Sequence, residues 1–168
     1  GIEQVVICTP DKDLSQCVTG SRVICRDRRR AIDRDEAGVV ARFGVAPASI
    51  PDWLALVGDS SDGFPGIPGF GEKGAAAVLA RYLHIEAIPD DPAAWSVDVR
   101  GKERLAAALR ERRDEAALYK KLATLRTDVP LAEDLAALEW RGAPRARLEA
   151  LLARIGALEL LDRVPRWS

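Results

Sequence analysis

The stretch that decides the fold reads GDSSDGFPGIPGFGEK, at residues 58–73. Its first part is a polar turn that carries two carboxylates, Asp59 and Asp62. Its second part interleaves glycine and proline with apolar side chains, so that proline restricts the backbone and the apolar residues anchor it. We therefore predict an ordered loop here and not a flexible linker.

A helix is predicted directly after this loop, over residues 72–83. Its apolar positions recur at helical spacing; they are Ala75, Val78, Leu79, Tyr82 and Leu83. Three glycines lead into the helix start, where unpaired N–H groups carry the positive end of the helix dipole; they are Gly66, Gly69 and Gly71. Lys73 adds a positive charge in the first turn. This junction favours contact with a nucleic-acid phosphate backbone, and the alternative is a tight helix–helix turn that binds nothing.

A second pair of carboxylates, Asp11 and Asp13, follows an apolar run at residues 5–8 that predicts a buried parallel strand over residues 4–9. Open α/β sheets place their ligands at the carboxyl ends of strands, and Mg²⁺ and Mn²⁺ prefer oxygen ligands. Together with Asp59 and Asp62, the chain offers four candidate metal ligands. For each pair, the alternative is that the carboxylates only accept hydrogen bonds within a turn.

The remaining predicted elements are mostly helices. They are a short helix at 13–19, a strand at 22–25, a helix begun by a capping box at Asp33–Glu36 and stopped by Gly44, a helix from Pro51 to Gly58, a helical region at 101–125 interrupted near Arg113–Asp114, and final helices at 145–155 and 158–163. Two strands do not make a stable sheet by themselves, so we expect a sheet that this chain does not contain. The abrupt start at a strand predicts a fragment, a processed chain or an excised domain.

The charge composition shows no global basic excess, because 25 basic and 26 acidic residues give a net charge of −1. Two local basic runs, at residues 26–30 and 110–113, are interpreted as solvated faces. No stretch approaches the roughly 20 apolar residues of a membrane span, and no leader sequence is evident. These features favour a cytoplasmic protein without a membrane partner.

Two further residue types are interpreted as structural. Cys8, Cys17 and Cys25 lack the spacing of a zinc site, so we predict reduced, buried thiols. The single histidine, His84, lies late in the predicted helix and away from the carboxylates, so we predict a structural or exposed role.

In their order along the chain, these motifs resemble the bacterial 5′–3′ exonucleases, a family that includes the 5′-nuclease domain of bacterial DNA polymerase I. The matching segments are TPDKDLSQ at 9–16, GDSSD at 58–62, PGIPGFGEK at 65–73 and LRTDVPL at 125–131. The resemblance implies an α/β fold, mostly helical in this chain, that is the C-terminal part of a PIN-like 5′-nuclease with a helix–three-turn–helix element. It implies the end of the nuclease core at 1–57, the helix–three-turn–helix at 58–84 and a helical region at 85–168.

The resemblance also assigns roles to residues. Asp11, Asp13, Asp59 and Asp62 match acidic ligands on the second-metal side of the family's site. Four residues match the helix–three-turn–helix loop that grips the duplex backbone and often holds K⁺ through its carbonyl groups; these are Gly66, Gly69, Gly71 and Lys73. Gly63 stands where the family usually has asparagine. The family's first half, with its other metal carboxylates, basic residues and arch, is missing from this chain.

The implied function is a structure-dependent DNA 5′ nuclease, either a 5′–3′ exonuclease or a flap endonuclease, that works in replication and repair. It would hydrolyse phosphodiesters of 5′ flaps and of nicked or branched duplexes with two Mg²⁺ or Mn²⁺ ions. One alternative is a non-catalytic duplex-DNA-binding module or a catalytically incomplete fragment. Another is an aspartate-based phosphatase or sugar-nucleotide transferase, against which the Gly/Pro hairpin and the helical C-terminal half argue.

Overall fold

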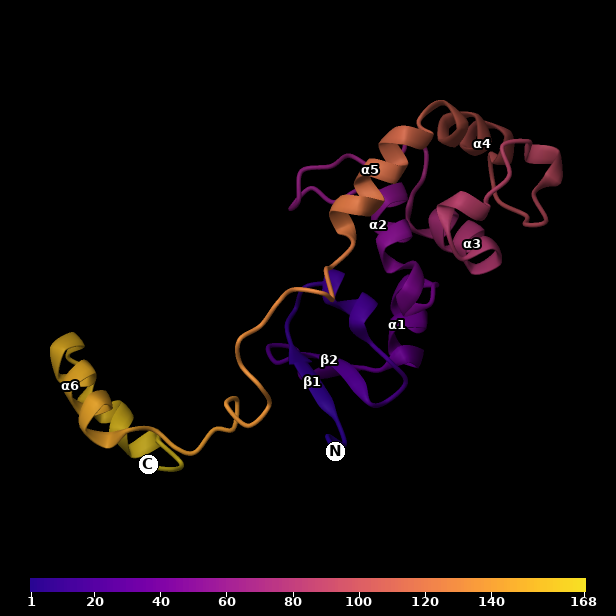
Figure 1. The fold of residues 1–168 in the computed structure, drawn as a ribbon. Helices are drawn as coiled ribbons and strands as arrows, with labels where there is room; N and C mark the ends of the chain where they lie inside the picture. Colours follow the sequence, from indigo (N-terminus) through magenta and orange to yellow (C-terminus); the bar gives the residue numbers. More distant parts are fainter. The chain divides into compact units, whose positions relative to one another are not determined.

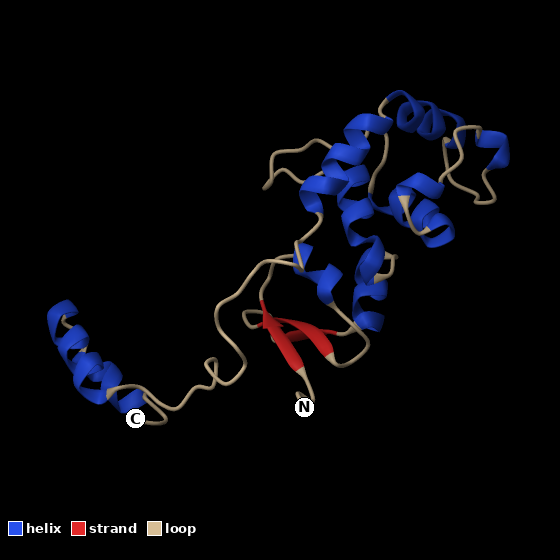
Figure 2. Cartoon of the chain, viewed as in Figure 1, coloured by secondary structure: helices blue, strands red, loops and turns tan.

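The computed structural model describes all 168 residues as two compact units, Gly1–Arg126 and Thr127–Ser168. Figure 1 labels the α-helices α1 to α6 and the strands β1 and β2, and Figure 2 colours the chain by type of secondary structure. The first unit contains a small sheet and most of the helices, and the second contains one α-helix and one 3₁₀ segment. The candidate ligands of the sequence analysis all lie in the first unit.

The sheet has three strands in the order β1 (Val5–Cys8), β2 (Val23–Asp27) and β3 (Ile32–Arg34). β1 pairs parallel to β2, and β2 pairs antiparallel to β3. The prediction that β1 is buried was wrong for its ends, because Val5 is 40% exposed and Cys8 is also exposed. β1 has a neighbour on one side only, so its other edge remains open.

The short strand β3 was not predicted, and it corrects the predicted capping box. Asp33 lies within β3, where its carboxylate accepts two hydrogen bonds from Arg26, at 2.6 and 2.5 Å. Asp35 is the residue that caps the next helix, since its side chain accepts from the N–H of Gly38 at 2.8 Å. The sequence spacing placed the N-cap two residues too early, because Asp33 pairs with β2 as part of β3 and the helix begins only after it.

Five α-helices and four 3₁₀ turns complete the first unit. They are η1 (Asp13–Cys17), α1 (Glu36–Phe43), η2 (Pro47–Ser49), α2 (Ile50–Val57), α3 (Glu72–Tyr82), η3 (Ile85–Ala87), η4 (Pro92–Ala94), α4 (Lys102–Glu111) and α5 (Arg113–Ala123). The predicted stops at Gly44 and Gly58 are confirmed, since both are C-caps with positive φ. The predicted interruption of the long helical region falls at Arg112, between α4 and α5.

Helix α2 forms the centre of the core. Every residue from Ile50 to Leu56 is buried, and the helix packs against both α3 and α5. Trp53 meets the ring of Phe43 edge-on, with 5.2 Å between ring centroids. The apolar anchors of the predicted loop are buried as expected; they are Phe64, Ile67 and Phe70. The loop is therefore held by the core, as its composition predicted.

A buried carboxylate, Asp52 of α2, joins α2 to the chain that follows α3. It accepts hydrogen bonds from the N–H of Ile85 at 2.8 Å and lies 3.0 Å from Nδ1 of His84. The ammonium of Lys120 on α5 lies 2.8 Å from the same carboxylate. His84 therefore has a structural contact, in agreement with its predicted role.

Arg113, in the second basic run, is likewise a structural residue. Its guanidinium donates to the carbonyl oxygens of Ile85, at 2.8 Å, and of Ile88, and to Asp90. The prediction of a solvated face was wrong for this arginine, because folding brings its guanidinium to carbonyl oxygens at the start of η3 and just after it.

The second unit is built on α6 (Arg145–Ile155) and η5 (Leu158–Arg163), which are separated by Gly156 in a left-handed conformation. Arg145 lies over the ring of Trp167, 5.2 Å from its centroid. None of the helices in either unit is long and apolar enough to cross a membrane. Of the cysteines, Cys25 is buried and Cys17 partly so, whereas Cys8 is exposed, which corrects the prediction of three buried thiols.

Candidate functional site

Three of the four predicted acidic residues converge. Carboxylate oxygens of Asp13, Asp59 and Asp62 lie within 4.8 Å of one another. Asp13 begins η1 after strand β1, and the other two lie in the turn that follows α2. Asp11 is exposed and is not one of the three; its Oδ1 accepts from the N–H of Asp13 at 3.1 Å. Asp11 therefore shapes the turn that presents Asp13.

The turn after α2 is closed by backbone hydrogen bonds. Asp59 and Phe64 exchange two N–H···O bonds, at 2.9 and 3.1 Å, and Oδ1 of Asp59 accepts from the N–H of Ser61 at 2.9 Å. Asp59 itself is only 5% exposed. The carboxylate of Asp59 is thus held in one orientation by the backbone around it.

Two glycines allow this turn to return beside the end of α2. Gly66 has a φ of +74°, and a Cβ on it would lie 2.5 Å from the backbone nitrogen of Gly58. A Cβ on Gly58 would lie 2.5 Å from the carbonyl oxygen of Pro65. Gly66 is buried by this close approach, so one of the four residues predicted to contact DNA has a structural requirement of its own.

The other three predicted DNA contacts lie at the start of α3. Gly69 has a φ of +91°, Gly71 is the extended N-cap of the helix, and Lys73 is in its first turn. All three are exposed, and no heavy atom lies within 4 Å of a Cβ placed on Gly71. This surface leaves the first N–H groups of α3 accessible to an anion.

The carboxylates influence one another's protonation. Burial, followed by the charge of Asp11 and a hydrogen bond shared with Asp62, raises the pKa of Asp13 to about 6. Oδ1 of Asp13 is buried without a hydrogen-bond partner. A buried, unpartnered oxygen beside two more carboxylates suits a hard divalent cation, which would both neutralise and coordinate it.

Lys12 lies inside the acidic group and is absent from the predicted site. Its ammonium donates to the carboxylate of Asp59. Burial opposes the charge of Lys12, but the hydrogen bond and the surrounding carboxylates outweigh it and raise the pKa of the lysine. Burial alone would likewise raise the pKa of Asp59, yet the bonds from Lys12 and Ser61 leave it lowered. In the sequence, the only indication of a positive charge within this acidic group is the position of Lys12 between Asp11 and Asp13.

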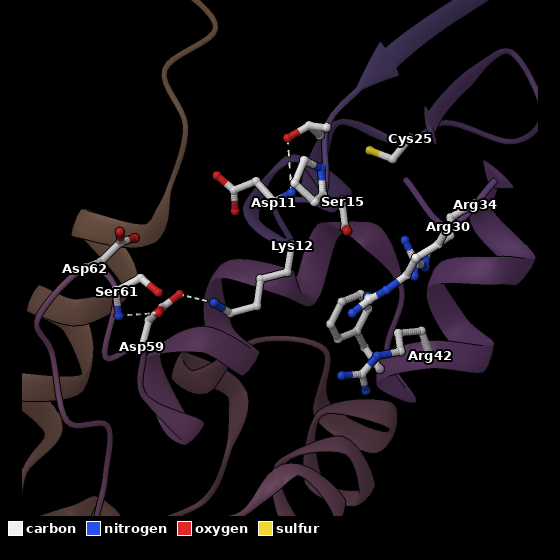
Figure 3. Close-up of a pocket in the computed structure, with 13 residues that line it drawn as sticks. Asp11, Lys12, Ser15, Cys25, Arg30, Arg34, Arg42, Asp59, Ser61 and Asp62 are labelled. Atoms are coloured by element: carbon white, nitrogen blue, oxygen red, sulfur yellow. Dashed lines mark hydrogen bonds and ion pairs between the residues drawn. The ribbon is translucent and has the colours of Figure 1, made fainter. Parts of the chain in front are cut away.

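All of these residues except Asp13 border a cleft of about 480 Å³. Asp11, Lys12, Asp59 and Asp62 lie toward one side of it, and three arginines lie toward the other, as Figure 3 shows. The arginines are Arg30, Arg34 and Arg42. The cleft therefore combines a place for a cation with a place for an anion.

Comparison with known proteins defines the class. The family described as "5'-3' exonuclease, C-terminal SAM fold" matches residues 45–146, which is more than half of the chain. The chain therefore belongs to the 5′–3′ exonuclease family, as its motifs predicted.

Individual relatives agree with this family. The chain is 38% identical over 172 residues to the 5'-3' exonuclease of Streptomyces coelicolor, covering 95% of this chain and 54% of that protein. It is 38% identical over 163 residues to the DNA polymerase I of Pseudomonas aeruginosa, covering 92% of this chain and 17% of the polymerase. The chain thus spans about half of one relative and less than a fifth of the other.

A solved structure carries the same fold. The T5 5'-exonuclease, described with bound divalent zinc ions, superposes with a TM-score of 0.61 at 17% identity, over 72% of this chain and 43% of that one. The predicted fold class, an α/β fold that is mostly helical in this chain and forms the C-terminal part of a 5′ nuclease, is confirmed by this match. The expectation that the chain contains no sheet of its own was wrong, because β3 completes a three-stranded sheet.

Proposed function

We propose that this chain is the metal- and DNA-binding C-terminal part of a structure-dependent DNA 5′ nuclease, a 5′–3′ exonuclease or flap endonuclease. The observation that carries the proposal is the convergence of Asp13, Asp59 and Asp62 within 4.8 Å, beside a cleft that Asp59 and Asp62 line. Membership of the 5′–3′ exonuclease family supports it. A T5 flap endonuclease described in complex with DNA and metal ions has the same fold, with a TM-score of 0.58.

Asp13, Asp59 and Asp62 would hold a Mg²⁺ or Mn²⁺ ion, with Asp11 at the rim of the site. Two such ions, when bound in the complete site, supply charge neutralisation at the scissile phosphate and a more acidic water. The backbone around Asp59 orients its carboxylate, and Lys12 offsets part of the acidic charge before metal binds. The other metal carboxylates would come from the N-terminal half of the nuclease.

Duplex DNA would lie against the start of α3. Gly69 and Gly71 leave the backbone open, Lys73 supplies a positive charge, and Gly66 shapes the loop. K⁺ bound to loop carbonyl groups would add to this contact. We assign 1–57 to the end of the nuclease core, 58–84 to the helix–three-turn–helix and 85–168 to a helical region. The substrates would be 5′ flaps and nicked or branched duplexes, in cytoplasmic replication and repair.

The first test is Mn²⁺ binding, measured by calorimetry on the 168-residue chain. Asp59→Asn is expected to abolish most of the binding, because it removes a ligand of the converged group. Asp11→Asn is expected to weaken binding less, and Asp98→Asn, which alters an exposed carboxylate elsewhere, is the matched control. Equal binding by all four forms would exclude the converged carboxylates as the metal site.

The second test is cleavage of a labelled 5′-flap DNA with Mn²⁺, with and without EDTA, by this chain supplemented with the N-terminal half of the Streptomyces coelicolor relative. Metal-dependent cutting that is lost in Asp59→Asn supports the nuclease. Salt-sensitive DNA binding without cutting in any combination would favour the non-catalytic DNA-binding module instead. If the chain neither binds nor cuts the DNA, both functions are excluded.

A further inference from the structure

Three arginines from separate elements line the side of the cleft opposite the carboxylates. Arg30 lies in the turn between β2 and β3, Arg34 ends β3, and Arg42 is in the last turn of α1. Figure 3 shows the side chains of Arg30, Arg34 and Arg42 on one side of the cleft, with the labelled acidic residues on the other side. The basic run at 26–30 is therefore not uniform, because Arg30 alone among its arginines lines the cleft.

The positive charges of this trio are weakly neutralised within the protein. Arg34 makes no ion pair in the structure. Arg30 lies 3.7 Å from Asp27, whose Oδ1 accepts the backbone N–H groups of Arg29 and Arg30 and so serves the turn. Arg42 lies 3.4 Å from Glu72, in a pair whose side chains are 50% and 58% exposed. Exposed pairs of this kind bind weakly, so an anion can replace them.

Other arginines of the same region lie outside the cleft, and one of them is firmly paired. Arg26 makes a bidentate pair with Asp33, at 2.6 and 2.5 Å, and it does not line the cleft. Arg28 and Arg29 are exposed and also lie outside the cleft lining. Its location in the cleft therefore distinguishes the trio from Arg28 and Arg29, and its available donors distinguish it from Arg26.

The trio also connects the two parts of the proposed nuclease site. Its cleft is shared with Asp59 and Asp62, and Arg42 touches Glu72, the first residue of α3. The end of α1 packs closely on α3, since a Cβ on Gly44 would lie 2.8 Å from the Cβ of Ala76. A strand that runs from the carboxylates to the start of α3 would pass over these arginines.

We propose that Arg30, Arg34 and Arg42 form a binding site for a phosphate group of the DNA strand, next to the metal-binding carboxylates. The guanidinium group presents a planar fork of donors that matches two phosphate oxygens, and three such groups suit one or two neighbouring phosphates. The site rests on the proposed function and adds a strand contact that is separate from Lys73. Its ligand is either an internal phosphodiester or a 5′-terminal phosphate.

The test is equilibrium binding of a fluorescent duplex with a 5′ single-stranded overhang, in EDTA and at several KCl concentrations. Arg30→Gln/Arg34→Gln is compared with Arg28→Gln/Arg29→Gln, which removes the same amount of charge from neighbouring positions outside the cleft. We expect the first variant to bind about tenfold or more weakly. Its slope of log affinity against log salt should become shallower by roughly 1.4 to 1.8, at about 0.7 to 0.9 for each lost contact.

Arg42 is tested by two substitutions, because it also packs on Phe43, 5.0 Å from the ring centroid. Arg42→Gln is expected to lower the salt slope by about one contact, and Arg42→Lys is expected to retain the slope with weaker affinity. Unchanged binding in Arg42→Gln would remove this residue from the site and overturn the trio.

The controls separate this site from the proposed function. If wild-type chain binds DNA and both double variants lose affinity and slope equally, overall charge explains the effect and the site is refuted alone. If wild-type chain does not bind DNA at low salt, the DNA-binding function fails and the site fails with it. A selective loss in Arg30→Gln/Arg34→Gln supports the site, and a loss confined to 5′-phosphorylated DNA identifies the terminal phosphate as its ligand.

Discussion

Replacing Gly66 with alanine is expected to destabilise the first unit strongly, whereas the same change at Gly63 should not. Both glycines lie in the loop after α2, with φ angles of +74° and +80°. A Cβ at Gly66 would lie 2.5 Å from both the nitrogen of Gly58 and the carbonyl carbon of Val57. A Cβ at Gly63 has no heavy atom within 4 Å. Comparing the two variants therefore separates the energetic cost of the left-handed backbone conformation from the cost of the close approach between backbone segments.

The magnitude follows from these contacts. A left-handed conformation costs a non-glycine residue about 1–2 kcal/mol, and this cost applies to both variants. At Gly66 the backbone must also move apart, which adds about 1–3 kcal/mol for overpacking. The movement strains the hydrogen bond from the N–H of Ile67 to the carbonyl of Leu56, at 2.9 Å, which contributes about 1 kcal/mol more. Gly66→Ala should lose roughly 3–6 kcal/mol, against about 1–2 kcal/mol for Gly63→Ala.

The assay is urea unfolding followed by far-ultraviolet circular dichroism, with both variants and the wild type at one pH. Gly66→Ala is expected to unfold at much lower urea or to fail to fold, and Gly63→Ala to lie near the wild type. Gly63→Asn, which restores the residue usual in the family, should be closer still, because asparagine tolerates the left-handed region. Equal destabilisation by Gly66→Ala and Gly63→Ala would refute the role of the Gly58–Gly66 contact.

Three further predictions concern stability. Asp52→Ala should lower the free energy of unfolding by about 3–5 kcal/mol, because it leaves Lys120 without its buried partner. The control is Glu86→Ala, whose side chain is 64% exposed in the wild type and which should change stability by less than about 1 kcal/mol. Urea unfolding midpoints measure both effects. Folding raises the pKa of Asp13 from 3.8 to about 6, so the folded state binds this proton more tightly, and the free energy of unfolding should fall as pH rises from about 4 to about 6. In EDTA, Asp13→Asn should lack that fall and be more stable than the wild type at pH 7. Parallel curves of stability against pH for the two proteins would contradict this prediction. Arg113→Met should lose about 2–4 kcal/mol, because it removes the hydrogen bonds of Arg113 to η3 and to Asp90. Arg110→Met, which changes an exposed arginine, should stay near wild type in thermal melts.

The sequence by itself determined the local elements of this protein. Helical periodicity located α3, and the residues that stop or start helices are read from short-range rules, as Gly44, Pro51 and Gly58 illustrate. The apolar anchors in the 58–73 loop predicted its order, and the sequence of motifs along the chain predicted the family. These signals are local because capping, turn chemistry and periodicity act within a few residues.

The tertiary structure decided which of the candidate residues act together. It grouped Asp13 with Asp59 and Asp62, left Asp11 outside the group, and placed Lys12 on Asp59, 47 residues away. It assigned Arg30 to the cleft and left its neighbours in the same run outside. Such pairings depend on how β1, α1 and α2 pack, and packing brings together side chains whose separation in sequence carries no distance information. Charge and residue type in the sequence fix what each group can do, and only the packed core fixes which groups share one site.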